Sequence, residues 1–134
     1  MAEQVSSLLR RSIEHLAEEG PAGYRLLLQQ LGPLVVELDV DGETFALSGG
    51  HELQVTDGGA DAPAVRIRTS RSAILDVLDA TVGLGDAVDT DKLCVRGTLD
   101  DVLRAHDTLL AYVHAAVRAP AHPALLRALR AGAP

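Results

Sequence analysis

Aromatic residues are scarce in this sequence, and tryptophan is absent. Of the 134 residues only Tyr24, Phe45 and Tyr112 are aromatic, although 47% of the residues are apolar. Any interior must therefore be built from aliphatic side chains, namely those of Leu, Val, Ile and Ala. A chain of this length is enough for one domain with an ordinary core.

Cysteine and targeting signals are also lacking. The single cysteine, Cys94, has no partner for an internal disulfide, and the N-terminal segment lacks the basic region and continuous apolar stretch of a signal peptide. No apolar run approaches the roughly 18–20 residues that span a bilayer. We therefore expect a cytoplasmic protein with no integral association with membranes.

Positive charge is in short supply. Lys and Arg number 12 against 19 Asp and Glu, which gives a formal net charge of −7. Nucleic acids and anionic membranes are bound through clustered Lys and Arg side chains. The composition therefore argues against nucleic acid as a partner, and the excess of acidic residues is that of a soluble protein.

Helical periodicity marks both ends of the chain. Apolar residues at three- and four-residue steps predict an amphipathic first helix, and a second helix that starts at Pro21 and ends at Gly32. A short helix capped by Thr69 or Ser70 is expected, and the longest helix is expected after Thr98. The apolar stripe of the longest helix consists of Leu99, Val102, Leu103, His106, Leu109, Leu110, Val113 and Val117. The tail after Pro120 is compatible with one more short helix.

From Leu34 onward the period changes to two, which is typical of strands. The alternating segments are "LVVELDV", "ETFALS", "HELQV", "AVRIRT" and "KLCVR". Turn residues at Asp41-Gly42 and Gly49-Gly50 predict that the first three form an antiparallel meander. The segments "DGGADAP" and "GLGDAVDT" contain glycines but lack the spacing that cradles phosphate, so they are interpreted as loops.

This order of elements predicts an α+β fold with a five-stranded, mostly antiparallel sheet and helices packed on one face. We expect a single domain over residues 1–134, with two N-terminal helices in 1–32, a core of sheet and helix in 34–118 and a C-terminal tail in 120–134. The other face of the sheet is expected to meet water. It would carry Glu37, Glu52, Arg66, Arg68 and Arg96.

Few residues could carry chemistry. The histidines show no paired spacing that would place two ligands on one helical face, so no metal site is predicted. No cofactor motif is present, and we expect no cofactor. Cys94 lies out of phase with the apolar residues of its strand, which favours a small residue on the outer face of the sheet over a nucleophile.

From Leu34 onward the chain resembles the SCP2-like domains of the sterol carrier protein 2 family. The resemblance lies in the double hairpin with Asp41-Gly42, in the run "DAPAVRIRTS" where a strand leads into a helix, and in "KLCVRGTLDDVLR". Gly97 in that last segment suits a sharp turn from strand to helix, because glycine accepts backbone angles that other residues avoid. The composition, rich in Ala, Arg, Gly and Leu, is associated with bacteria of high G+C content and indicates a small bacterial, single-domain member.

The resemblance implies an apolar cavity enclosed by the sheet and the helices, of about 300–1,000 Å³ as in other small-molecule sites. Its ligand would be a hydrophobic small molecule, such as a lipid, an acyl chain, or a sterol-like, polyketide-like or terpenoid-like compound. The residues expected to line the cavity are Val36, Leu38, Phe45, Leu47, Ile67, Leu78, Val95, Val102, His106, Leu109, Leu110 and Tyr112. His106, Tyr112 and Tyr24 are the candidates for orienting a polar head group.

Two other functions stay open. Imidazole titrates near neutrality, so His106 could exchange a proton in a small cofactor-independent cyclase or isomerase of bacterial secondary metabolism that uses the same cavity. Alternatively, the core is solid and His106 is bonded to a neighbouring carbonyl. The amphipathic first helix, or Leu125, Leu126 and Leu129 of the tail, would then dock a partner or pair two copies into a homodimer.

Overall fold

The structure, a computed structural model, describes residues 4–131, in which two helices precede four strands and the fifth strand lies between two pairs of helices. The helices are α1 (Val5–Glu19), α2 (Pro21–Leu31), α3 (Arg71–Leu78), α4 (Leu84–Asp89), α5 (Leu99–Arg118) and α6 (His122–Ala131). The strands are β1 (Val36–Val40), β2 (Glu43–Ser48), β3 (Gln54–Asp57), β4 (Val65–Thr69) and β5 (Cys94–Arg96).

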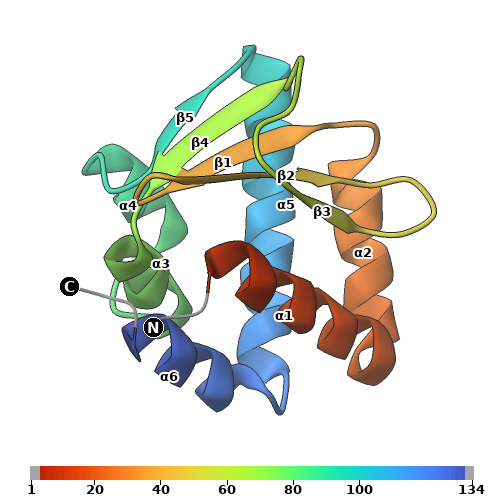
Figure 1. The fold of residues 1–134 in the computed structure, drawn as a ribbon, viewed down its shortest axis with the longest axis vertical. Helices are drawn as coiled ribbons and strands as arrows, with labels where there is room; N and C mark the ends of the chain where they lie inside the picture. Colours follow the sequence, from red (N-terminus) through yellow and green to blue (C-terminus); the bar gives the residue numbers. More distant parts are fainter. Residues whose placement is uncertain (1–3, 132–134) are drawn as a thin grey trace.

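One mixed sheet forms a layer of the molecule (Figure 1). Its strand order is β3-β2-β1-β4-β5, in which β1 and β4 are parallel and the other neighbouring pairs are antiparallel. The prediction of an α+β fold with a five-stranded, mostly antiparallel sheet is confirmed. Asp41 and Gly42 join β1 to β2 with φ angles of 53° and 89°, as a two-residue hairpin turn with positive φ at both positions requires.

The helices gather on one face of this sheet (Figure 1). Val65 and Ile67 of β4 point toward the helices and are only 1% and 2% exposed. Arg66 and Arg68 alternate with them and are exposed, as is Arg96 opposite Arg66 on β5. The prediction that these three arginines lie on the wet face of the sheet is confirmed.

The strand β3 begins later than the sequence predicts. The alternation indicates a strand over residues 51–55, whereas β3 covers Gln54–Asp57. The backbone N–H of Leu53 donates to the hydroxyl of Tyr24 on α2 at 2.9 Å, so this position is tied to a helix. Glu52 therefore lies in the preceding loop and not on the wet face of the sheet.

The first helix is capped from the sheet. Its N-cap residue Gln4 makes no side-chain hydrogen bond to the helix. Instead the carboxylate of Glu43, at the start of β2, accepts hydrogen bonds from the N–H groups of Val5 and Ser6 at 2.8 and 2.9 Å. A carboxylate here satisfies two of the unpaired N–H groups and interacts favourably with the helix dipole. This contact fixes the start of α1 against the sheet.

The interpretation of "GLGDAVDT" as a loop is wrong, because the segment contains α4. Leu84 and Ala87 lie three residues apart on one side of this helix and are buried, at 8% and 1% exposure. Asp86 stands in the first turn, where a negative charge is favourable. The helix is too short for its period to be visible in the sequence, and it forms because its two apolar residues reach the core.

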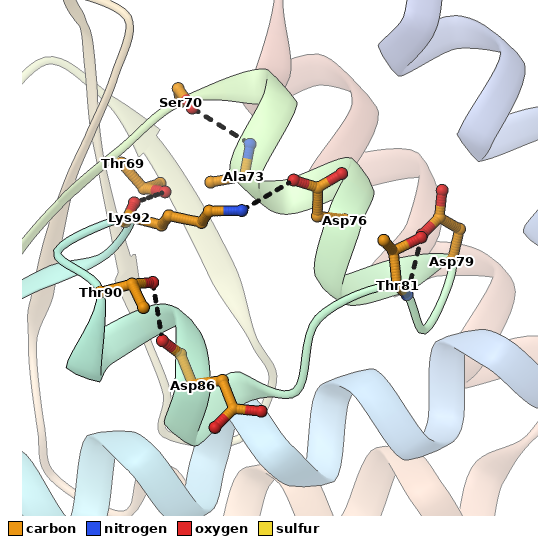
Figure 2. A network of polar contacts seen from close by, with 9 residues as sticks. All are labelled: Thr69, Ser70, Ala73, Asp76, Asp79, Thr81, Asp86, Thr90 and Lys92. Carbon is orange, nitrogen blue, oxygen red and sulfur yellow. Dashed lines mark hydrogen bonds and ion pairs between the residues drawn. The ribbon is translucent and has the colours of Figure 1, made fainter.

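Polar contacts connect the end of β4, α3 and the segment before β5 (Figure 2). The Nζ of Lys92 lies 3.4 Å from Oδ2 of Asp76 on α3, and the hydroxyl of Thr69 donates to the carbonyl of Lys92 at 2.9 Å. Ser70 caps α3 by accepting from the N–H of Ala73 at 3.1 Å. The end of β4, the start of α3 and the segment before β5 are therefore bonded to one another.

Between residues 4 and 131 no helix combines the length and the apolar character that crossing a membrane requires. Within the same range, no group of three or more His, Cys, Asp or Glu side chains is arranged to hold a metal ion. Cys94 is exposed and pairs with Arg68 across the strands, in agreement with its predicted place on the outer face.

Candidate functional site

A cavity of about 140 Å³ lies between the sheet and the helices. We call it the aliphatic cavity, because its walls are aliphatic side chains from β1, β2, β4 and the helices, with few polar groups. Its volume is smaller than the 300–1,000 Å³ expected from the sequence. A water-sized group occupies about 30 Å³ of liquid, so the cavity has room for about four or five methylene groups. An intact sterol is far larger than this space.

Most of the residues predicted to line the cavity do so. They are Val36, Leu38, Phe45, Leu47, Ile67, Leu78, Leu109 and Tyr112. The strand residues among them follow from the alternation of each strand, since every second side chain points toward the helices. The sequence pattern therefore predicts the sheet side of the cavity well.

Four predicted residues do not line the cavity: Val95, Val102, His106 and Leu110. Three of them belong to α5, whose inward face is rotated relative to the predicted stripe. Leu99 and Leu103, which start that stripe, are 73% and 54% exposed. The inward face keeps Leu109 and Val113 of the predicted stripe and adds Ala105, Thr108 and Tyr112.

Small residues lie at the closest contacts of α5. Ala105 and Ala116 are 1% and 2% exposed and Thr108 is 2% exposed, so small side chains occupy the most enclosed positions of this helix. The helix α2 packs closely against α5, because a Cβ atom at Gly23 would lie 3.2 Å from the Cβ of Ala115. Because the two helices approach closely, only small side chains fit between them, and larger side chains lie on other faces of α5.

His106 lies outside the aliphatic cavity. It follows Ala105 by one position, which is about 100° around the helix. Its side chain is 39% exposed, and its Nδ1 lies 3.8 Å from the Oδ1 of Asp107. The expectation that His106 faces a ligand in this cavity is therefore not met by the geometry.

The helices contribute lining residues that the sequence analysis does not place there. They include Val5, Leu8, Leu9 and Ile13 of α1, Ala73, Ile74 and Val77 of α3, and Leu125 and Leu129 of α6. The sequence does indicate that these residues form apolar helix faces, since the first helix and the tail are amphipathic. What the sequence does not show is which side chains of these apolar faces reach the cavity.

The polar groups of the aliphatic cavity already have partners. The hydroxyl of Tyr112 lies 2.7 Å from Oγ of Ser12 on α1. Thr108 donates to the carbonyl of Arg104 at 2.8 Å, and Thr69 donates to Lys92 as described above. Burial raises the pKa of the Tyr112 phenol, and its hydrogen bond with Ser12 offsets part of that effect. Tyr112 therefore stays neutral at physiological pH, and the cavity presents little charge to a guest.

A second cavity, of about 270 Å³, lies between α1, the end of α5 and the start of α6. Its walls differ from those of the first, because they include Arg11, Ser12 and His15 of α1 and His122 of α6. The remaining lining residues are Leu8, Ala116, Ala119, Ala121, Ala124, Leu125 and Ala128. Leu8 and Leu125 line both cavities, so the two spaces share a wall.

The fold is that of the sterol carrier protein 2 domains. A structure described as "UbiJ-SCP2 Ubiquinone synthesis protein" is similar with a TM-score of 0.60 and 17% identity over 80% of this chain and 95% of that chain. Palmitated SCP2L2 from Aedes aegypti gives a TM-score of 0.57 and 21% identity over 81% of this chain and 95% of that chain. The sterol carrier protein domain 2 of Helicoverpa armigera gives 0.59 and 14%, over 84% and 94%.

At the level of sequence the comparisons find less. No protein-family model matches the chain, and no curated protein matches it significantly. The likeness to the solved structures is thus one of fold, and it confirms the SCP2-like architecture that the residues from Leu34 onward indicate. The function has to be argued from the cavities themselves.

Proposed function

We propose that the protein binds a hydrophobic small molecule by taking an aliphatic tail into the aliphatic cavity. The observation that carries this proposal is the cavity itself, about 140 Å³ between the sheet and the helices, with walls of Leu, Val, Ile and Ala. Palmitate in one structure of the same fold agrees with such a role. Carriage or presentation of a lipid-like ligand is the function that this arrangement serves.

The driving force for binding is the removal of apolar surface from water. Each methylene group that enters the cavity contributes about 0.8 kcal/mol. Water gains little from occupying the same space, because a buried water needs two to four polar partners and the hydroxyls here are already engaged. The cavity therefore favours a tail without polar groups.

The alternative of a cyclase or isomerase depends on His106. A general acid or base has to reach the reacting atom directly or through one water. His106 does not line the aliphatic cavity, and its side chain is partly exposed at the surface. No observation favours the enzymatic alternative, so we propose binding and not catalysis.

A series of 1-alkanols from propanol to decanol tests the proposal. Titration followed by amide chemical shifts should place the perturbed residues around Leu38, Ile67 and Leu109, which line the cavity. Affinity should rise about fourfold with each methylene group, and the increment should become smaller once the roughly five-group space is filled. Absence of binding by every alkanol, or shifts confined to other surfaces, contradicts the proposal.

A further inference from the structure

Four large apolar side chains are exposed among residues 4–131, and three of them lie on α5. Leu99, Leu103 and Val117 are 73%, 54% and 41% exposed. The fourth is Leu26, at 47%, on α2, the helix that packs directly against α5. Exposed apolar side chains that gather in one region, unlike isolated ones, mark interaction surfaces. The exposed apolar surface of this protein is thus concentrated on one pair of helices.

The exposed apolar side chains of α5 share one face of the helix. Leu99, Leu103, Leu110 and Val117 follow one another at intervals of four, seven and seven residues, which keep side chains on one side of an α-helix. We call these four residues the outer row; Leu110 is its half-buried member. The row extends over about 27 Å of helix, so it is long enough for a second helix to lie along it.

The outer row is complementary to a second copy of itself. Leu99 and Val117 are separated by 18 residues, or about five helical turns, so they project in the same direction at opposite ends of α5. In an antiparallel pair of α5 helices, Leu99 of one copy therefore lies beside Val117 of the other, and Leu103 lies within one turn of Leu110. Such a contact uses the same surface on both copies and closes as a twofold-symmetric dimer.

The two ends of α5 carry opposite charges that fit an antiparallel pair. Asp100 lies in the first turn and Arg118 in the last turn, and both are exposed. They are also 18 residues apart, so they lie on the same flank of the outer row. Neither side chain has an ion-pair partner among the described residues. An antiparallel pair brings Asp100 of each copy to Arg118 of the other, whereas a parallel pair brings like charges together.

We propose that a second copy of this chain packs antiparallel along the outer row of α5 and forms a twofold-symmetric dimer. The apolar row supplies the contact, and the two pairs of Asp100 and Arg118 fix the direction of the helices. Asp107, whose side chain is 62% exposed, lies near the twofold axis and faces its own counterpart, so the repulsion between them keeps the dimer weak. The outer row lines neither cavity, so this inference is independent of the proposed function.

Sedimentation equilibrium of the full chain tests the contact. Between about 10 µM and 1 mM the wild type should show a monomer–dimer equilibrium. Leu103→Glu places a charge in the outer row and should weaken dimerisation at least about tenfold. Ala17→Glu adds the same charge at an exposed position of α1 and should change it by less than about twofold. A wild type that stays monomeric, or a dimer that Leu103→Glu leaves intact because another surface forms it, overturns the proposal.

Two charge reversals test the direction of the helices. Asp100→Arg and Arg118→Asp each bring like charges together twice in a dimer, so each variant alone should dimerise at least about tenfold more weakly than the wild type. An equimolar mixture of the two variants should associate within about threefold of the wild type, because the mixed dimer again contains two pairs of opposite charge. Mixing does not repair a folding defect within one chain, so this recovery is specific to contact between copies. A mixture that associates as weakly as each variant alone overturns the antiparallel arrangement.

Discussion

At the scale of single residues, Gly97 shows how closely the turn between β5 and α5 approaches the start of β4. A Cβ atom at this position would lie 2.8 Å from the carbonyl oxygen of Ala64 and 3.3 Å from Cγ2 of Val65. Gly97 does not have a positive φ, so the reason inferred from the sequence, a special backbone angle, is wrong. The close approach of the backbone at Ala64, just before β4, is what requires glycine here.

Gly97→Ala should therefore destabilise the protein by about 1–3 kcal/mol, the usual cost of forcing extra atoms into a packed site. Gly85 is the matched control, because it lies inside α4 and a Cβ there meets nothing within 4 Å. Gly85→Ala should be neutral or stabilise by up to about 1 kcal/mol through helix propensity. Urea unfolding of the two variants measures both effects; equal stabilities would contradict this account of Gly97.

Tyr112 makes stability depend on pH in the alkaline range. Its phenol has a raised pKa in the folded protein because it is buried, and the hydrogen bond with Ser12 opposes this only in part. In the unfolded chain tyrosine ionises near pH 10. Above that pH the unfolded state binds fewer protons than the folded state, so the free energy of unfolding falls as the pH rises.

Tyr112→Phe removes this titration. Urea unfolding between about pH 8 and 11 should show a shallower loss of stability in the variant than in the wild type, by up to about 1.4 kcal/mol per pH unit. The variant also loses the hydrogen bond to Ser12, so a constant offset near neutral pH is expected. Identical slopes above pH 10 would show that Tyr112 is not protected from ionisation.

At the scale of elements, Glu43 decides how α1 begins. Its carboxylate accepts from two N–H groups of the first turn, and no side chain at the N-cap position does so. Glu43→Ala should cost about 1–2 kcal/mol of unfolding free energy. Glu14→Ala, at an exposed position of the same helix, should change it by less than about 0.5 kcal/mol. A similar effect of both substitutions would argue against a capping role.

The strands and the longer helices could be predicted because their apolar residues repeat with a clear period. Val65 and Ile67 of β4 are an example, since the alternation alone places both in the core. The rotation of α5 could not be predicted, because it depends on the packing of elements that are far apart in the sequence, such as α2 and α5, which approach closely at Gly23 and Ala115. His106 does not line the aliphatic cavity, whereas Ala105 does, although an alanine contributes little to an apolar pattern in the sequence.

The second cavity was beyond the reach of sequence analysis for a related reason. His15 and His122 come from opposite ends of the chain, and neither belongs to a motif. Only the packing of α6 beside α1 brings them to one space. Pairing of residues over such distances leaves no local pattern that a single sequence can display.

At the scale of the whole molecule, the C-terminal helix α6 contributes side chains to the hydrophobic core and to the walls of both cavities. Leu129 of α6 is 2% exposed, and Leu125 lines both cavities. Arg130 lies 3.6 Å from the Oδ2 of Asp79 at the end of α3, which ties α6 to its neighbour. Of the three tail leucines considered from the sequence for docking a partner, Leu125 and Leu129 thus line the cavities, whereas Leu126 lines neither of them.

The central claim is that the aliphatic cavity between the sheet and the helices admits an apolar tail. Ala73 lines the aliphatic cavity and is buried, so Ala73→Leu places three more carbon atoms in or beside that space. Filling about three methylene positions removes roughly 2 kcal/mol of binding free energy. Ala17→Leu adds the same atoms at an exposed position of α1 and serves as the control.

The most direct measurement is the affinity of 1-octanol for these two variants, once circular dichroism has shown that both are folded. Ala73→Leu should bind at least about tenfold more weakly than the wild type, whereas Ala17→Leu should bind equally well. An Ala73→Leu variant that is folded and binds 1-octanol as tightly as the wild type would contradict the account, because the ligand would then lie elsewhere.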